Sequence, residues 1–117
     1  MNNKILYADG FKNNDKNGGY LVCNSNKKIL DYKDNWIGST HNEMEYKAVL
    51  SALQIADENA IIYSDSKLVV NQINGMWRVQ SPHIAPYFDV ALMLRKQIPN
   101  LTLEWVPRRM IVKELGH

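Results

Sequence analysis

The sequence lacks the features that hold small secreted or zinc-dependent proteins together. Its 117 residues include a single cysteine, Cys23, so no disulfide can form within the chain. Histidine and cysteine are nowhere grouped with the spacing of a structural zinc site. Both absences favour a reducing compartment, and they leave Cys23 as a small residue in the core or in a half-buried strand.

Long hydrophobic runs and blocks of one charge are also missing. No apolar stretch approaches the roughly 20 residues that cross a membrane, and residues 1–4 lead into a strand without the apolar core of a signal peptide. We therefore expect a cytoplasmic protein with no membrane partner. The net charge is only +2, which permits nucleic-acid binding without requiring it.

The length and the apolar pattern predict one domain over residues 1–117, which is long enough for one layered core but not for two. Apolar residues with a period of two predict strands over about 5–9, 20–24 and 28–37. A turn-forming stretch rich in asparagine and glycine, residues 13–19, separates the first two. These strands are expected to form an antiparallel meander.

The rest of the chain alternates helices with strands. Apolar residues spaced by three and four predict a helix beginning near Asn42, a second after Asp65 and a third over about 85–97. Short apolar strands are predicted over 60–64 and 101–105, and helical crossovers make them parallel to the first strand. This order predicts an α/β fold with a five-stranded mixed sheet flanked by helices.

Three acidic residues stand out because of their places in this pattern. Asp9 and Asp65 each follow an apolar strand, and Glu45 lies near the start of the first predicted helix. If the two strands are parallel neighbours, their carboxyl ends bring Asp9 and Asp65 together, and a helix packed across them adds Glu45. Three carboxylates so close would repel strongly unless cations lay between them, which predicts a divalent-metal site.

Each acid taken alone also has an ordinary structural role. Asp9 and Gly10 form a common turn dipeptide. Glu45 would complete a capping box if Asn42 capped the first helix, and Asp65 would be a natural cap for the helix that follows it. The conjunction of all three acids at one end of the predicted sheet favours the metal site over these separate roles.

Five short segments carry further information through their order along the chain. They are residues 7–10, 40–48, 63–70, 74–79 and 104–108. In this order they resemble the ribonuclease H family, in the compact type 1 form of bacteria, archaea and phages that has no basic protrusion. The resemblance implies the strand order 3-2-1-4-5. It also implies an endoribonuclease that cuts the RNA strand of RNA/DNA hybrids and leaves 5′-phosphate and 3′-hydroxyl ends.

The resemblance assigns two Mg²⁺ or Mn²⁺ ions to the acids. Asp9 would bridge both ions, Glu45 would serve the ion on the leaving-group side, and Asp65 would hold the ion that activates water. Two alternatives keep the fold and change its use. One is a module that binds hybrids without cleaving them, and the other is a nuclease of the same superfamily that acts on DNA junctions or integration ends.

The C-terminal segment departs from the family pattern. Family members usually carry a fourth metal-site residue at the start of a terminal helix, whereas this chain has Ile111 in place of a usual asparagine and stops at His117. We therefore expect the terminal helix to be missing. His117 is favoured over Glu114 as a fourth catalytic residue, and both could instead be frayed. The family implies a monomer, although an uncovered sheet would allow a dimer.

Substrate contacts are expected beside the acids. Side chains that can donate or accept hydrogen bonds suit the 2′-hydroxyl groups and phosphates of a hybrid, and an aromatic ring suits the DNA-strand groove. The candidates are Asn13, Asn14, Asn42, Gln72 and Trp77. Asn42 is favoured because it occupies a matching family position, whereas Gln72 and Trp77 also have ordinary structural roles. His41 and His83 are expected to be surface residues without a chemical role.

Overall fold

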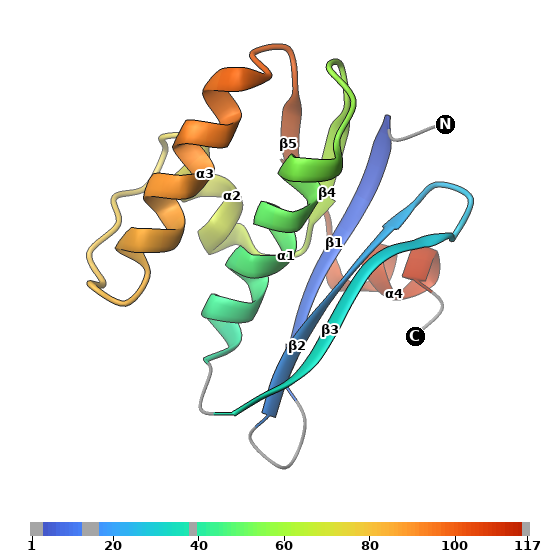
Figure 1. The fold of residues 1–117 in the computed structure, drawn as a ribbon, viewed down its shortest axis with the longest axis horizontal. Coiled ribbons are helices and arrows are strands. Elements are labelled where there is room, and N and C mark those ends of the chain that lie inside the picture. The colour runs from blue at the N-terminus through green and yellow to red at the C-terminus, as the bar shows by residue number, and fades with distance from the viewer. Residues whose placement is uncertain (1–3, 13–16, 38–39, 116–117) are drawn as a thin grey trace.

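The computed structural model describes residues 4–12, 17–37 and 40–115, which form five strands and four helices (Figure 1). In chain order these are β1 (Ile5–Lys12), β2 (Asn17–Asn24), β3 (Ile29–Ile37), α1 (His41–Ile55), β4 (Ile61–Ser64), α2 (Lys67–Ile73), α3 (Ala85–Gln97), β5 (Thr102–Trp105) and α4 (Arg108–Leu115). None of the helices within these ranges is long and apolar enough to span a membrane.

The strands form one mixed sheet in the order β3-β2-β1-β4-β5. β1, β2 and β3 pair antiparallel, while β4 lies parallel to both β1 and β5. The predicted α/β class and the strand order 3-2-1-4-5 are therefore confirmed. In Figure 1, α1 crosses the front of the sheet, α2 and α3 lie beside it, and α4 lies behind the strands.

The main core lies between the sheet and α1. Alternate residues of the central strands, among them Leu6, Ala8 and Ile62, are fully buried with Val49 and Ala52 of α1. This follows from the period of a strand, which sends successive side chains to opposite faces. Packing of α1 against this face places α1 over β1 and β4.

The first turn of α1 is capped by a different residue from the one we predicted. Thr40, not Asn42, is the N-cap: its hydroxyl accepts a hydrogen bond from the Glu43 amide at 3.1 Å, and the Glu43 carboxylate accepts one from the Thr40 amide at 3.0 Å. This reciprocal pair is a capping box, placed two residues earlier than expected. Glu45 therefore has no capping role, and its side chain is left to the site below.

Asp65 does not cap α2, which was the structural role considered for it. Ser66 is the N-cap of α2, and its hydroxyl accepts a hydrogen bond from the Val69 amide at 3.2 Å. A serine hydroxyl at this position satisfies one of the amides that open a helix. The carboxylate of Asp65 is thus available for other partners.

The terminal helix, which we expected to be missing, is present in a short form as α4. Its first turn follows Pro107, whose carbonyl accepts a hydrogen bond from the Met110 amide at 2.9 Å. Proline suits a helix start because that position has no intrahelical partner for an amide proton. Ile111, which stands where the family usually has asparagine, is fully buried and anchors the helix to the sheet.

Candidate metal centre

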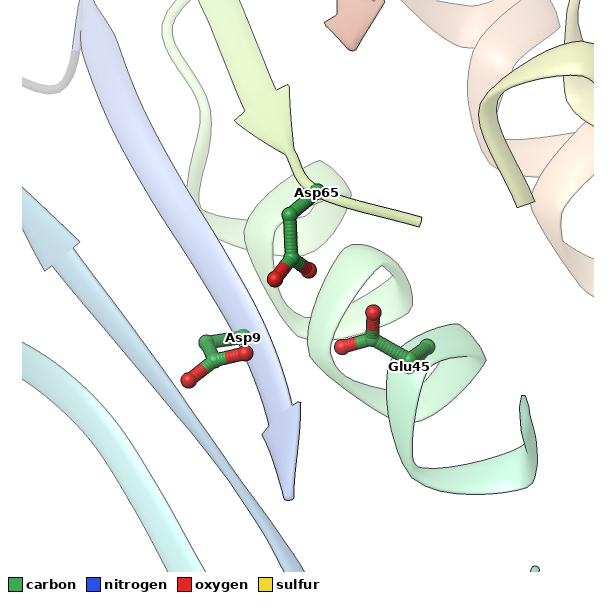
Figure 2. A group of neighbouring side chains, drawn as sticks. All are labelled: Asp9, Glu45 and Asp65. Atoms are coloured by element: carbon green, nitrogen blue, oxygen red, sulfur yellow. The ribbon is translucent and has the colours of Figure 1, made fainter. Parts of the chain in front are cut away.

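The register between β1 and β4 brings the first two acids together. Ala8 pairs with Ser64 in the parallel ladder, so the next residues are Asp9 within β1 and Asp65 just after the end of β4. α1 crosses the same place and adds Glu45. Figure 2 shows Glu45 of α1 and Asp65 at the end of β4 pointing toward the part of β1 that carries Asp9. One oxygen of each carboxylate lies within 4.8 Å of the others.

Gly10 has a role in this site that we did not predict. β1 continues to Lys12, and Gly10 pairs with Tyr20 of β2, so the turn considered for Asp9 and Gly10 does not exist. A Cβ atom on Gly10 would lie 2.3 Å from the backbone nitrogen of Glu45. The Gly10 amide also donates a hydrogen bond to the Glu45 carboxylate. Glycine in a strand often marks such a close backbone approach, so the glycine at position 10 was the sequence signal for this contact.

The carboxylates are buried, which makes their negative charges costly. The side chains of Asp9, Glu45 and Asp65 are 1%, 3% and 8% exposed. Burial raises the pKa of Glu45 to about 7, and the Asp65 charge adds to this while His41 opposes it. Asp65 Oδ1 is buried without a hydrogen-bond partner among the described residues. Such oxygens favour a cation at this position.

Arg108 supplies one positive charge to the cluster. Its Nη1 atom lies 2.6 Å from Asp9 Oδ1 and 3.0 Å from Asp65 Oδ2. Arg108 lies in residues 104–108, one of the five segments singled out in the sequence, but we did not predict its contacts. No local signal could have indicated them, because Arg108 lies 99 residues from Asp9 along the chain.

The donor set fits a hard divalent ion. Asp9, Glu45 and Asp65 present only oxygen ligands, and Mg²⁺ and Mn²⁺ prefer such ligands. The ligand oxygens lie close together, which suits the geometry of a bound ion. The buried Asp65 Oδ1 supplies a charged oxygen that such an ion could neutralise. These residues are therefore the ones that could hold a metal.

Glu114 and His117 were the other residues predicted for the centre. Glu114 is not among the three acids that the described part of the chain gathers. Burial raises the pKa of the buried Cys23 thiol to about 11, and the charge of Glu114 adds to the effect. His117 lies outside the described residues, as do Asn13 and Asn14.

His41 lies closer to the centre than expected of a plain surface residue. Its side chain is 56% exposed, but Nε2 lies 3.8 Å from Glu45 Oε2, one turn along α1. The neighbouring Glu45 carboxylate raises the pKa of His41, and the charges of Asp65 and Asp9 act in the same direction. The imidazole is thus a titratable neighbour of Glu45 on the same helix.

Asn42 and Gln72 line a cavity of about 390 Å³, and none of the three acids is among its lining residues. The other lining residues come from the start of α1, from α2 and from the segment before α3, and they are Thr40, Leu68, Arg78, Gln80, Ser81, His83 and Ile84. The Gln72 amide group is engaged at both ends, since it accepts from the Tyr46 hydroxyl and donates to the Arg78 carbonyl. Trp77 is 49% exposed and lies beyond the end of α2.

The raised pKa of Glu45 predicts a pH-dependent stability of the metal-free protein. The folded-state pKa, about 7, lies above the ordinary value of 4.5, so the folded state binds more protons between these values. In EDTA, the free energy of unfolding should therefore fall as the pH rises through this window, by about 1 to 3 kcal/mol. Glu45→Gln should remove this fall, because its amide does not titrate and still accepts the Gly10 hydrogen bond.

Thermal unfolding in EDTA at a series of pH values, for the wild type and Glu45→Gln, measures the effect. Glu58→Gln is the matched control because Glu58 is exposed and lies outside the cluster. It should follow the wild-type pH dependence. Parallel pH profiles for the wild type and Glu45→Gln would contradict the prediction.

Comparison with known protein families gives one match over most of the chain. Residues 7–112 match the family described as reverse transcriptase-like. The bifunctional protein Rv2228c of Mycobacterium tuberculosis is 34% identical over 74 residues, which are 60% of this chain and 20% of that protein. A ribonuclease H of Caldicellulosiruptor saccharolyticus is 33% identical over 84 residues, which are 66% of this chain and 56% of that protein.

Solved structures share the fold over nearly the whole chain. The N-terminal RNase H domain of Rv2228c has a TM-score of 0.74 at 28% identity, covering 94% of this chain and 86% of that one. LC11-RNase H1, solved in complex with an RNA/DNA hybrid, has a TM-score of 0.72 at 23% identity, covering 94% and 89%. The chain thus spans most of these structures but only a fifth to just over half of the two curated relatives.

Proposed function

The chain belongs to the reverse transcriptase-like family, with a ribonuclease H fold, and from this premise we propose that it cuts the RNA strand of RNA/DNA hybrids. The observation that carries the proposal is the convergence of Asp9, Glu45 and Asp65 within 4.8 Å at the strand ends. Two relatives support the substrate: one is named ribonuclease H, and LC11-RNase H1 was solved with a hybrid.

We assign the three acids to a pair of Mg²⁺ or Mn²⁺ ions. When bound, such ions would activate water and neutralise the charge of the scissile phosphate and of the leaving 3′ oxygen. Asp9 would face both ions, with Glu45 on the leaving-group side and Asp65 on the water side. The Gly10 amide orients the Glu45 carboxylate, and burial of all three side chains limits their motion.

The reaction is a hydrolysis of one phosphodiester. A bond forms between the water oxygen and phosphorus while the bond from phosphorus to the 3′ oxygen breaks, and the 3′ oxygen takes up a proton. The products therefore carry 5′-phosphate and 3′-hydroxyl ends. His117, predicted as a fourth catalytic residue, stays a prediction because it lies outside the described residues.

The cavity lined by Asn42 and Gln72 is the proposed place for a backbone phosphate of the hybrid. The exposed side chains of Asn42 and Arg78 line it and can donate to phosphate oxygens. Gln72 would act through position, since its own hydrogen bonds hold the Arg78 carbonyl against α2. Trp77 is exposed enough to contact the DNA strand.

The remaining proposals concern the protein as a whole. We propose that residues 1–117 act as one domain, as a monomer, in the cytoplasm. Asn13 and Asn14 stay predicted substrate contacts, outside the described residues.

A cleavage assay tests the proposed function. Labelled RNA/DNA hybrid is incubated with the protein in Mg²⁺, Mn²⁺ or EDTA, and RNA/RNA, DNA/DNA and single-stranded RNA serve as controls. We expect metal-dependent cutting of the hybrid RNA strand, with 3′-hydroxyl ends that a polymerase can extend. Binding of the hybrid without cutting in either metal would instead indicate a binding module, and cutting of DNA alone would indicate a DNA nuclease.

A further inference from the structure

Arg108 places a positive charge where the proposed function requires metal ions. One guanidinium nitrogen, Nη1, lies 2.6 Å from Asp9 Oδ1 and 3.0 Å from Asp65 Oδ2. It therefore joins two acids that come from neighbouring strand ends. At these distances the guanidinium nitrogen donates a charge-assisted hydrogen bond to each carboxylate.

The oxygens that Arg108 contacts belong to the carboxylates that would hold the metal. Asp9, Glu45 and Asp65 each offer one ligand atom to the cluster. A divalent ion placed among them would meet the guanidinium at close range, and two positive charges so close repel each other. Arg108 and a divalent ion therefore compete for Asp9 and Asp65.

The Arg108 side chain can move away from the two carboxylates without a change in the fold. Its side chain is 52% exposed, whereas the side chains of Asp9 and Asp65 are 1% and 8% exposed. The two acids are fixed by β1 and by the end of β4, while Arg108 is the first residue of α4 (Arg108–Leu115) and reaches the cluster from its rim. The long, flexible arginine side chain can thus turn to solvent while the carboxylates stay where they are.

We propose that Arg108 is a resident counter-ion of the metal centre, which neutralises Asp9 and Asp65 in the metal-free protein and lowers the affinity of the centre for divalent ions. This inference rests on the proposed function, because it concerns the same metal site. In this role Arg108 acts on metal binding through Asp9 and Asp65. Its charge offsets one of the three formal negative charges that the described residues bring together.

Calorimetric titration of the full chain with Mn²⁺ tests the inference. Arg108→Gln removes the charge, and we expect Mn²⁺ to bind about 10- to 100-fold more tightly than to the wild type. The melting temperature in EDTA should fall, because two buried acids lose their counter-ion. Arg108→Lys keeps the charge and should stay near the wild-type affinity. Arg108→Met, which keeps the aliphatic stem without the charge, replaces Arg108→Gln if that variant does not fold.

Arg109→Gln is the matched control, since it removes the same charge from the next residue, which is exposed. It should change neither the Mn²⁺ affinity nor the melting temperature in EDTA. Equal Mn²⁺ affinity in the wild type and Arg108→Gln, or an equal gain in Arg109→Gln, would overturn the inference. Either of these two outcomes would leave the proposed function standing. The proposed function fails separately if the wild type binds Mn²⁺ and leaves the hybrid uncut.

Discussion

Replacing Asp65 by asparagine is expected to slow cleavage of the RNA/DNA hybrid by about 10²- to 10³-fold or more, which corresponds to several kcal/mol of lost charge stabilisation in the transition state. Asparagine has the size of aspartate but a neutral amide, so it cannot match the affinity of a carboxylate for a divalent ion. Trp105 donates to the backbone carbonyl of residue 65, and this bond survives the change. The loss should thus be chemical rather than structural.

Two measurements separate these effects. Cleavage rates in Mg²⁺ and Mn²⁺ give the chemical loss, and thermal unfolding in EDTA gives the stability, which should stay level or rise because one of three repelling acids becomes neutral. Asp89→Asn, on the exposed side of α3, is the matched control and should cleave at the wild-type rate. Undiminished cleavage by Asp65→Asn would remove this carboxylate from the proposed mechanism.

The sequence predicted the acids of the centre because local patterns place them. Asp9 and Asp65 follow apolar strands, and a strand end is fixed by a few neighbouring residues. Because Ala8 pairs with Ser64 in the parallel ladder, the two acids that follow them lie close together. The error in the helix cap, Thr40 in place of Asn42, left Glu45 in the right position because the helix itself was correctly placed.

Contacts between distant parts of the chain were not predictable in this way. Gly10 approaches Glu45 across 35 residues, and the Arg108 contact with Asp9 spans 99. Both depend on the angle at which a helix crosses the sheet, which no local pattern sets. The short α4 was missed for a related reason: the burial of Ile111 against the sheet stabilises a helix that the departure from the family pattern concealed.

Replacing Gly10 by alanine is expected to damage the fold and the metal centre together. The added Cβ would lie 2.3 Å from the Glu45 nitrogen and 2.4 Å from the Met44 carbonyl carbon. These are backbone atoms of α1, so no side-chain rotation can relieve the clash, and β1 and α1 must separate. We expect a loss of about 3 kcal/mol or more in the free energy of unfolding, the upper end for an overpacked core. Urea unfolding and Mn²⁺ titration measure the two effects.

Gly75→Ala separates the clash from the general cost of replacing a glycine. Gly75 has a φ of +83° and no atom within 4 Å of an added Cβ, so alanine there meets strain of about 1 kcal/mol but no clash. It should leave Mn²⁺ affinity unchanged, whereas Gly10→Ala should weaken it because Glu45 moves away from Asp9 and Asp65. Equal stability losses in the two variants would contradict the close crossing of α1 over β1. Asp65→Asn should lose cleavage and keep its stability, whereas Gly10→Ala should lose both stability and Mn²⁺ affinity.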